Sequence, residues 1–124
     1  MSDRIKVDGI GGVFFRAQDP AGLAQWYLAH LGIDLVPTSE EGQPWVQQGG
    51  PTVFAPFAAD TDYFGADTNK QFMLNFRVAN LNGLIAQLKA EGIEVSTPEE
   101  MPPIGWFARL YDPEGNPVEL WQPA

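Results

Sequence analysis

The chain has no cysteine, and His30 is the single histidine among its 124 residues. Without cysteine there are no disulfide bonds, thiolate nucleophiles, iron–sulfur clusters or cysteine-ligated zinc sites. Any imidazole mechanism has to pass through His30, which falls near the end of a predicted helix. A serine or cysteine hydrolase is not expected, because no histidine lies near a plausible nucleophile.

Basic residues are also scarce, with 7 lysines and arginines against 16 acidic residues and a net charge of −9. Such a surface repels phosphate groups, so neither nucleic acid nor an anionic membrane is an expected partner. No apolar run approaches the roughly 20 residues of a membrane span. The opening "MSDRIKVDG" lacks the apolar core of a signal peptide. We therefore expect a cytoplasmic protein.

What the chain does contain is an internal repeat. Residues 12–35 match residues 73–95, as "FFRAQDPAGL" against "NFRVANLNGL" shows. The last strands match as well, since "TVFAP" (52–56) aligns with "ELWQP" (119–123). We predict one domain over 1–124, with module 1 at about 9–58, a connector at about 59–71 and module 2 at about 72–123.

Each module reads as a βαβββ unit. An apolar strand is followed by a helix that can be capped at Asp19 or Asn80 and that ends at Gly32 or Gly92 in a left-handed conformation. "DPEGN" (112–116) is expected to close a hairpin. The strands predicted after the helices span about 33–37, 44–48 and 52–57 in the first copy, and about 93–96, 106–111 and 117–121 in the second.

This pattern resembles the vicinal oxygen chelate superfamily, which includes glyoxalase I, extradiol dioxygenases, fosfomycin resistance proteins and bleomycin resistance proteins. Two features carry the resemblance: the repeat with FR in its first strands, and the DPxGNxxEL turn and strand at 112–120. It implies an α+β fold in which two tandem βαβββ modules form a cupped mixed sheet. In metal enzymes of this superfamily the ligands lie on the first and last strands of each module, which here correspond to Gly12, Thr52, Met73 and Glu119.

Only Glu119 of these four positions is a good ligand for a divalent cation. A catalytic metal needs about three histidine or carboxylate ligands, whereas glycine has no side chain, methionine is a soft thioether and threonine is a weak neutral ligand. We therefore predict no metal and no cofactor, with one divalent metal in an altered site as the alternative.

Strand periodicity extends these positions to a whole surface, because residues i, i+2 and i+4 share one face. Glu119 is the candidate catalytic residue on this cup face, and eight other residues are candidate ligand contacts. The contacts are Phe14, Arg16, Thr52, Phe54, Met73, Asn75, Arg77 and Trp121. The predicted core, facing the helices, is Val13, Phe15, Val53, Leu74, Phe76, Val78, Val118 and Leu120.

Several roles stay open for the polar residues. Glu119 either accepts a hydrogen bond inside the cup, orients a ligand or acts as a base whose pKa is raised by burial. Arg16 and Arg77 either pair with carboxylates at the strand ends or bind an anion. The aromatic residues Tyr63, Phe64, Trp106 and Phe107 either rim a ligand or pack in an interface or core.

These observations favour a metal-free protein that binds a small aromatic or amphipathic molecule in the cup. The net charge suits a cationic ligand better than an anionic one. The resemblance to bleomycin-binding proteins implies a homodimer, because such proteins build their site between two subunits. The alternative is a lyase, isomerase or dioxygenase that uses a divalent metal, or Glu119 with Tyr111 or Arg77 as acid and base.

Overall fold

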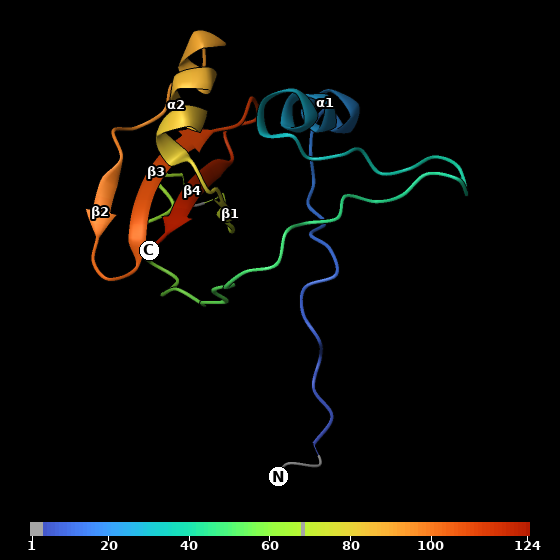
Figure 1. The fold of residues 1–124 in the computed structure, drawn as a ribbon, viewed down its shortest axis with the longest axis horizontal. Helices are drawn as coiled ribbons and strands as arrows, with labels where there is room; N and C mark the ends of the chain where they lie inside the picture. The colour runs from blue at the N-terminus through green and yellow to red at the C-terminus, as the bar shows by residue number, and fades with distance from the viewer. Residues whose placement is uncertain (1–3, 68) are drawn as a thin grey trace.

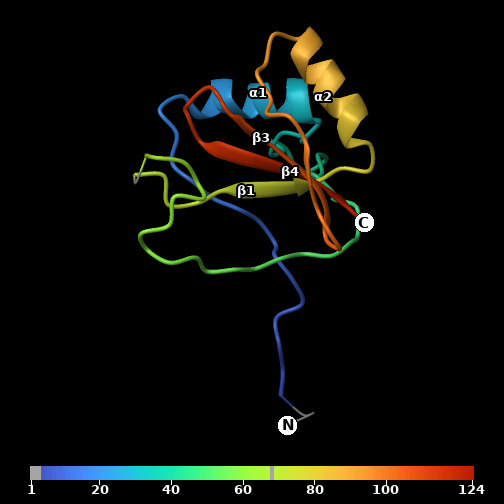
Figure 2. The same ribbon diagram turned by 90° about the vertical axis from the view of Figure 1, so that its left-hand side faces the viewer.

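The computed structural model describes residues 4–67 and 69–124. The fold is α+β, as predicted, with two helices on one face of a four-stranded mixed sheet (Figures 1 and 2). The strand order is β1-β4-β3-β2, in which β1 runs parallel to β4 and the other pairs are antiparallel. The elements are α1 (Pro20–Leu31), β1 (Leu74–Arg77), α2 (Leu81–Ala90), β2 (Glu99–Met101), β3 (Gly105–Tyr111) and β4 (Pro117–Pro123).

The two helices begin and end as the repeat predicts. Asp19 and Asn80 are the N-caps, and each side chain accepts a hydrogen bond of 3.0 Å from the backbone amide three residues on. Gly32 and Gly92 then take positive φ angles of 72° and 83°. Neither helix of the described residues is long and apolar enough to cross a membrane.

The core lies between the helices and the sheet. Leu88 and Val118 have no exposed surface, and Leu81, Leu110 and Leu120 are 1% exposed. The prediction that Val118, Leu120, Phe76 and Val78 face the helices is confirmed, because all four belong to or pack against this core. Each large aliphatic side chain buried in this way contributes roughly 1.5–3 kcal/mol.

The turn at 112–116 closes the β3–β4 hairpin, as predicted, and also joins the two copies of the repeat. Asp112 is 4% exposed and accepts hydrogen bonds from the amides of Glu114 and Asn116 and from the Asn116 side chain. Its Oδ2 also accepts a 2.7 Å bond from the Tyr27 hydroxyl on α1. The Glu114 carboxylate accepts from the backbone amides of Gln18 and Asp19, at the start of α1.

The strands predicted for the first copy are not formed. Among the described residues, the segments 12–16, 33–37, 44–48 and 52–57 carry no strand (Figure 2). Much of this half is exposed. Val13, Phe15 and Val53, predicted as core, are 54%, 44% and 70% exposed. They are exposed because these segments have no paired neighbour that would hold alternate side chains against the helices.

One smaller prediction also needs correction. In the second copy no strand forms at 93–96, and the strand that pairs with β3 at this side is β2, at Glu99–Met101. His30 lies in the last turn of α1, as predicted, and its Nδ1 makes a 2.9 Å contact with the Glu91 carboxylate at the end of α2. The two helix C-terminal ends therefore meet.

Candidate functional site

The sheet face turned away from the helices carries the polar and aromatic side chains of the site. The register sets Asn75, Glu119 and Arg109 side by side across β1, β4 and β3. The next row towards the end of β4 holds Arg77 and Trp121, with Phe107 beside them. Alternation along each strand therefore gathers residues that are far apart in sequence on one surface.

Glu119 is the centre of this face and is 7% exposed. Its Oε2 accepts a 2.6 Å hydrogen bond from the Tyr63 hydroxyl, and its Oε1 accepts a 2.9 Å bond from the Asn75 amide. The Arg109 guanidinium lies 3.8 Å from Oε2 and partly balances the charge. A buried carboxylate needs such partners, because burial without them is costly.

Tyr63 reaches Glu119 from the connector rather than from the sheet. Its ring stacks on Phe57 at 5.4 Å between centroids, and the Arg109 guanidinium lies 5.0 Å from the ring centre. Phe64 packs against both aromatic rings of this cluster. Burial, and then the hydrogen bond to Glu119, raises the pKa of the Tyr63 phenol, so this hydroxyl keeps its proton and donates a hydrogen bond to the carboxylate.

Arg77 contacts the first copy of the repeat. Its Nη1 donates to the Pro51 carbonyl at 2.6 Å and lies 3.3 Å from the Thr52 hydroxyl, and its Nη2 donates to the Gln48 carbonyl at 2.7 Å. These partners are two backbone carbonyls and one hydroxyl, and no carboxylate pairs with Arg77 among the described residues. A Cβ on Gly50 would lie 2.7 Å from the Arg77 Nε, which explains a glycine at this approach.

The other predicted site residues are distributed unevenly. Trp121 stacks on Phe107 at 6.0 Å and donates to the Ile104 carbonyl, so it forms part of the sheet face. Met73 is half-buried just before β1. Phe14, Arg16 and Phe54 are exposed, with Phe14 at 96% and Phe54 at 84%, and lie on segments that form no strand. The structure therefore gathers the candidates from the second copy, and Thr52 through Arg77.

The residues at Glu119 do not suit a divalent metal. Both carboxylate oxygens already accept hydrogen bonds, and the Arg109 guanidinium lies 3.8 Å from Oε2. Within residues 4–67 and 69–124, no three histidine or carboxylate side chains come together as a ligand set. A cation at this point would meet one carboxylate and a neighbouring positive charge.

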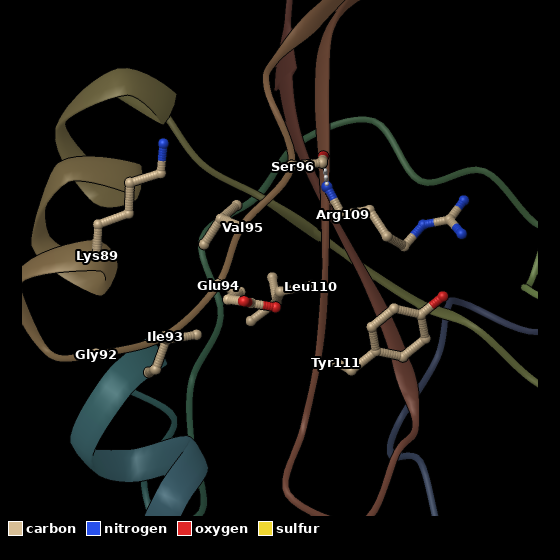
Figure 3. A pocket seen from close by; sticks show the side chains of 9 residues that line it. All are labelled: Lys89, Gly92, Ile93, Glu94, Val95, Ser96, Arg109, Leu110 and Tyr111. Carbon is tan, nitrogen blue, oxygen red and sulfur yellow. Dashed lines mark hydrogen bonds between the residues drawn. The ribbon is translucent and has the colours of Figure 1, made fainter.

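A hollow of about 670 Å³ lies elsewhere, between the end of α2, the segment after it and the outer edge of β3. Figure 3 shows Arg109 and Tyr111 on one side of β3 and Leu110 on the other, facing Ile93 and Glu94. Ser96 holds the two segments together, because its hydroxyl accepts a 2.7 Å bond from the Arg109 amide. Glu119 is not among the lining residues of this hollow.

Sequence reasoning missed the two partners that define the environment of Glu119. Arg109 could have been found, because closing the hairpin at 112–116 pairs Tyr111 with Pro117 and hence Arg109 with Glu119. Tyr63 had no such signal, since it comes from a connector whose path the sequence does not fix. The tyrosine that bonds Glu119 is Tyr63, whereas Tyr111 was the one proposed.

Comparison with known proteins decides the family. The glyoxalase-like domain family matches residues 12–121, which is most of the chain. The chain belongs to the glyoxalase-like domain family. No curated protein matches this glyoxalase-like domain.

Solved structures agree on the fold. The glyoxalase-like domain is similar to TnmS3, an antibiotic binding protein from Streptomyces sp. CB03234, at 23% identity and a TM-score of 0.66, covering 98% of this chain and 100% of that one. A glyoxylase/bleomycin resistance protein/dioxygenase domain from Frankia sp. EAN1pec shares 19% identity over 96% and 100% of the two chains, with a TM-score of 0.65. A lactoylglutathione lyase from Agrobacterium tumefaciens shares 19% over 94% and 95%, with a TM-score of 0.62. These likenesses confirm the glyoxalase/bleomycin resistance fold.

Proposed function

We propose that this glyoxalase-like domain is a metal-free protein that binds a small aromatic or amphipathic molecule on the sheet face around Glu119. The observation that carries the proposal is the environment of Glu119, a buried carboxylate held by Tyr63, Asn75 and Arg109 beside stacked aromatic rings. Apolar walls with a few fixed polar groups are typical of small-molecule sites. The similarity to an antibiotic binding protein supports small-molecule binding.

The experiment is a ligand screen with a matched pair of variants. Glu119→Gln removes the charge at the site, and Glu100→Gln removes an exposed charge on β2 in the same sheet. Compounds are ranked by the shift of the Trp121 indole resonance in NMR spectra. We expect Glu119→Gln to weaken binding by at least tenfold and Glu100→Gln to leave it unchanged. Equal binding by both variants would contradict the proposal.

Metal content and turnover test the alternative. Protein freed of its tag, incubated with nickel, zinc, manganese and ferrous iron and then desalted, is expected to hold near-zero metal by mass spectrometry. The enzyme hypothesis would be correct if each chain held one metal tightly. It would also be correct if the protein turned over an aldehyde, thiol adduct or catechol and Glu119→Gln abolished that turnover.

We also propose that the domain acts as a homodimer in the cytoplasm. Its first half exposes large apolar side chains, with Ile5 at 94%, Val7 at 91% and Val46 at 78%. Burying these side chains would favour association, and a second copy presents the same segments. Sedimentation and amide exchange at two protein concentrations test this: protection of residues 4–16 and 44–57 is expected to rise with dimer content. A monomer at all concentrations would contradict it.

A further inference from the structure

The Tyr63 side chain occupies the polar centre of the site. Its hydroxyl bonds the Glu119 carboxylate, one face of its ring stacks on Phe57, and the Arg109 guanidinium lies against the ring. We call the space between Glu119, Phe57 and Arg109 the slot. An aromatic ring with one hydroxyl matches its three features, which are a planar apolar face, a cation and a carboxylate acceptor. These are the contacts by which a protein would recognise a phenol.

We propose that Tyr63 is an internal occupant of the binding site, and that the ligand of this domain is a neutral hydroxyaromatic compound that replaces the Tyr63 phenol on Glu119. This inference rests on the proposed function, because it names the ligand class for the same face. It also gives Tyr63 a regulatory role, since every ligand at Glu119 has to compete with it.

The charges around the slot select a neutral donor. A carboxylate or phosphate ligand would meet Glu119 and a chain of net charge −9. A cationic ligand would meet the Arg109 guanidinium, whose Nε is buried without a hydrogen-bond partner among the described residues. The net charge of the chain by itself favours a cationic ligand. The Arg109 guanidinium beside Glu119 disfavours one. A phenolic hydroxyl is uncharged and donates one hydrogen bond to the carboxylate.

The segment that carries Tyr63 is held by local backbone bonds. Residues 58–65 form turns rather than a helix or strand, held by bonds from the Thr61 amide to the Ala58 carbonyl and from the Gly65 amide to the Asp62 carbonyl. Their own turn bonds do not involve the sheet. If Tyr63 withdrew, Glu119 would keep Asn75 and Arg109 but lose its shortest hydrogen bond. A ligand hydroxyl would restore that bond.

The first test asks whether the slot recognises a phenol. Tyr63→Ala empties the slot, and Phe64→Ala is the matched control, since it removes a ring of the same cluster that does not bond Glu119. Each variant is titrated with para-cresol and with toluene, which lacks the hydroxyl. We expect Tyr63→Ala to bind para-cresol at least tenfold tighter than toluene, and the double variant with Glu119→Gln to lose this preference. Equal binding of the two probes, or no binding by folded Tyr63→Ala, would overturn the inference.

The second test uses a change that keeps the ring, in case Tyr63→Ala does not fold. Tyr63→Phe deletes only the competing hydroxyl. We expect it to bind 2-naphthol several-fold tighter than the wild type does, with no change for 2-methylnaphthalene, as followed by the Asn75 side-chain amide resonance. Unchanged or weaker naphthol binding would show that Tyr63 does not compete. If no compound of any class binds the wild-type face, the proposed function is wrong. If compounds bind equally well with and without the hydroxyl, only this inference is wrong.

Discussion

Helix α1 in the first copy of the repeat and helix α2 in the second start from caps with the same backbone angles, φ −129° and ψ 82°. Beyond the helices the copies differ. The second copy builds all four strands of the sheet, whereas the matching segments of the first copy, within the described residues, form none. A helix closes its hydrogen bonds within a few residues, but a strand needs a partner.

The difference has a local origin in the last hairpin. In the second copy Asp112 organises a turn that pairs seven residues of β3 with β4. The first copy has Gly49, Gly50 and Pro51 before the equivalent strand, with no aspartate to bond the turn. Pro51 falls at the position of Val118, which pairs with Leu74 and Leu110, and proline has no amide proton to donate to a ladder. The same repeat therefore gives one sheet rather than two.

The largest expected effect comes from breaking the sheet that only the second copy forms. Gly105 has φ 136°, and a Cβ there would collide with the Gln122 carbonyl of β4. Gly105→Ala should cost about 3 kcal/mol of unfolding free energy, from strain and overpacking together. Chemical denaturation measures this. Gly9→Ala in the first copy, where a Cβ meets nothing within 4 Å, is the control and should change little; similar losses at both glycines would contradict the comparison.

A second effect is expected at the junction of the two copies. Asp112→Ala removes the acceptor of the Tyr27 hydroxyl and of the turn amides, and should cost about 2–3 kcal/mol, because buried donors are left unpaired. Asp67, an exposed aspartate that accepts from the Asn69 amide, is the matched control. A loss no larger than that of Asp67→Ala would mean that α1 is not held through Asp112.

The same junction predicts a pH dependence. Burial, together with the bond to Asp112, raises the pKa of the Tyr27 phenol. The native state therefore keeps its proton above pH 10, where an unfolded tyrosine ionises, so stability is full below about pH 10 and falls by about 1.4 kcal/mol per pH unit above it. The free energy of unfolding of Tyr27→Phe should fall less steeply with pH above about pH 10 than that of the wild type. An unchanged slope would show that Tyr27 does not carry this effect.

The smallest expected effect concerns the helix caps, which the two copies share. Asp19→Ala and Asn80→Ala each remove one cap bond of 3.0 Å and should each cost about 1 kcal/mol. Thermal unfolding of both variants measures the pair, with Asp19→Asn as the variant that keeps a cap. Near-equal losses would confirm that the helices are locally equivalent, and a loss at one cap more than twice the loss at the other would refute it.

The parts of the fold that follow from local chemistry were predictable. Caps, glycine ends and the hairpin depend on a few neighbouring residues, so Asp19, Asn80, Gly32 and Gly92 were placed correctly. The core face of the second copy followed from alternation along β1 and β4. The same alternation failed at Val13 and Val53, because periodicity says which side chains share a face but not whether the strand pairs.

The site was predictable only in its sheet component. Glu119 and Asn75 were placed together correctly from the repeat, because matched strands carry matched positions. Arg109 required the register of the hairpin, and Tyr63 required the path of a connector that has no periodic pattern. Contacts between segments distant in sequence depend on closing a long loop, which leaves no mark in the residues themselves.

The turn at 112–116 limits how this chain could be rearranged. Its Glu114 carboxylate holds the two amides that precede α1, and the Lys70 ammonium donates to the Glu114 carbonyl at 3.0 Å. One short turn therefore closes the hairpin, holds the backbone just before α1 and anchors the connector. New chain ends made by circular permutation, or an inserted peptide, would disrupt all three of these contacts if placed at 112–116. The exposed segment at 38–44 makes no such contacts in the described structure. A split or permuted version of this protein should therefore be opened in the first copy and left closed in the second.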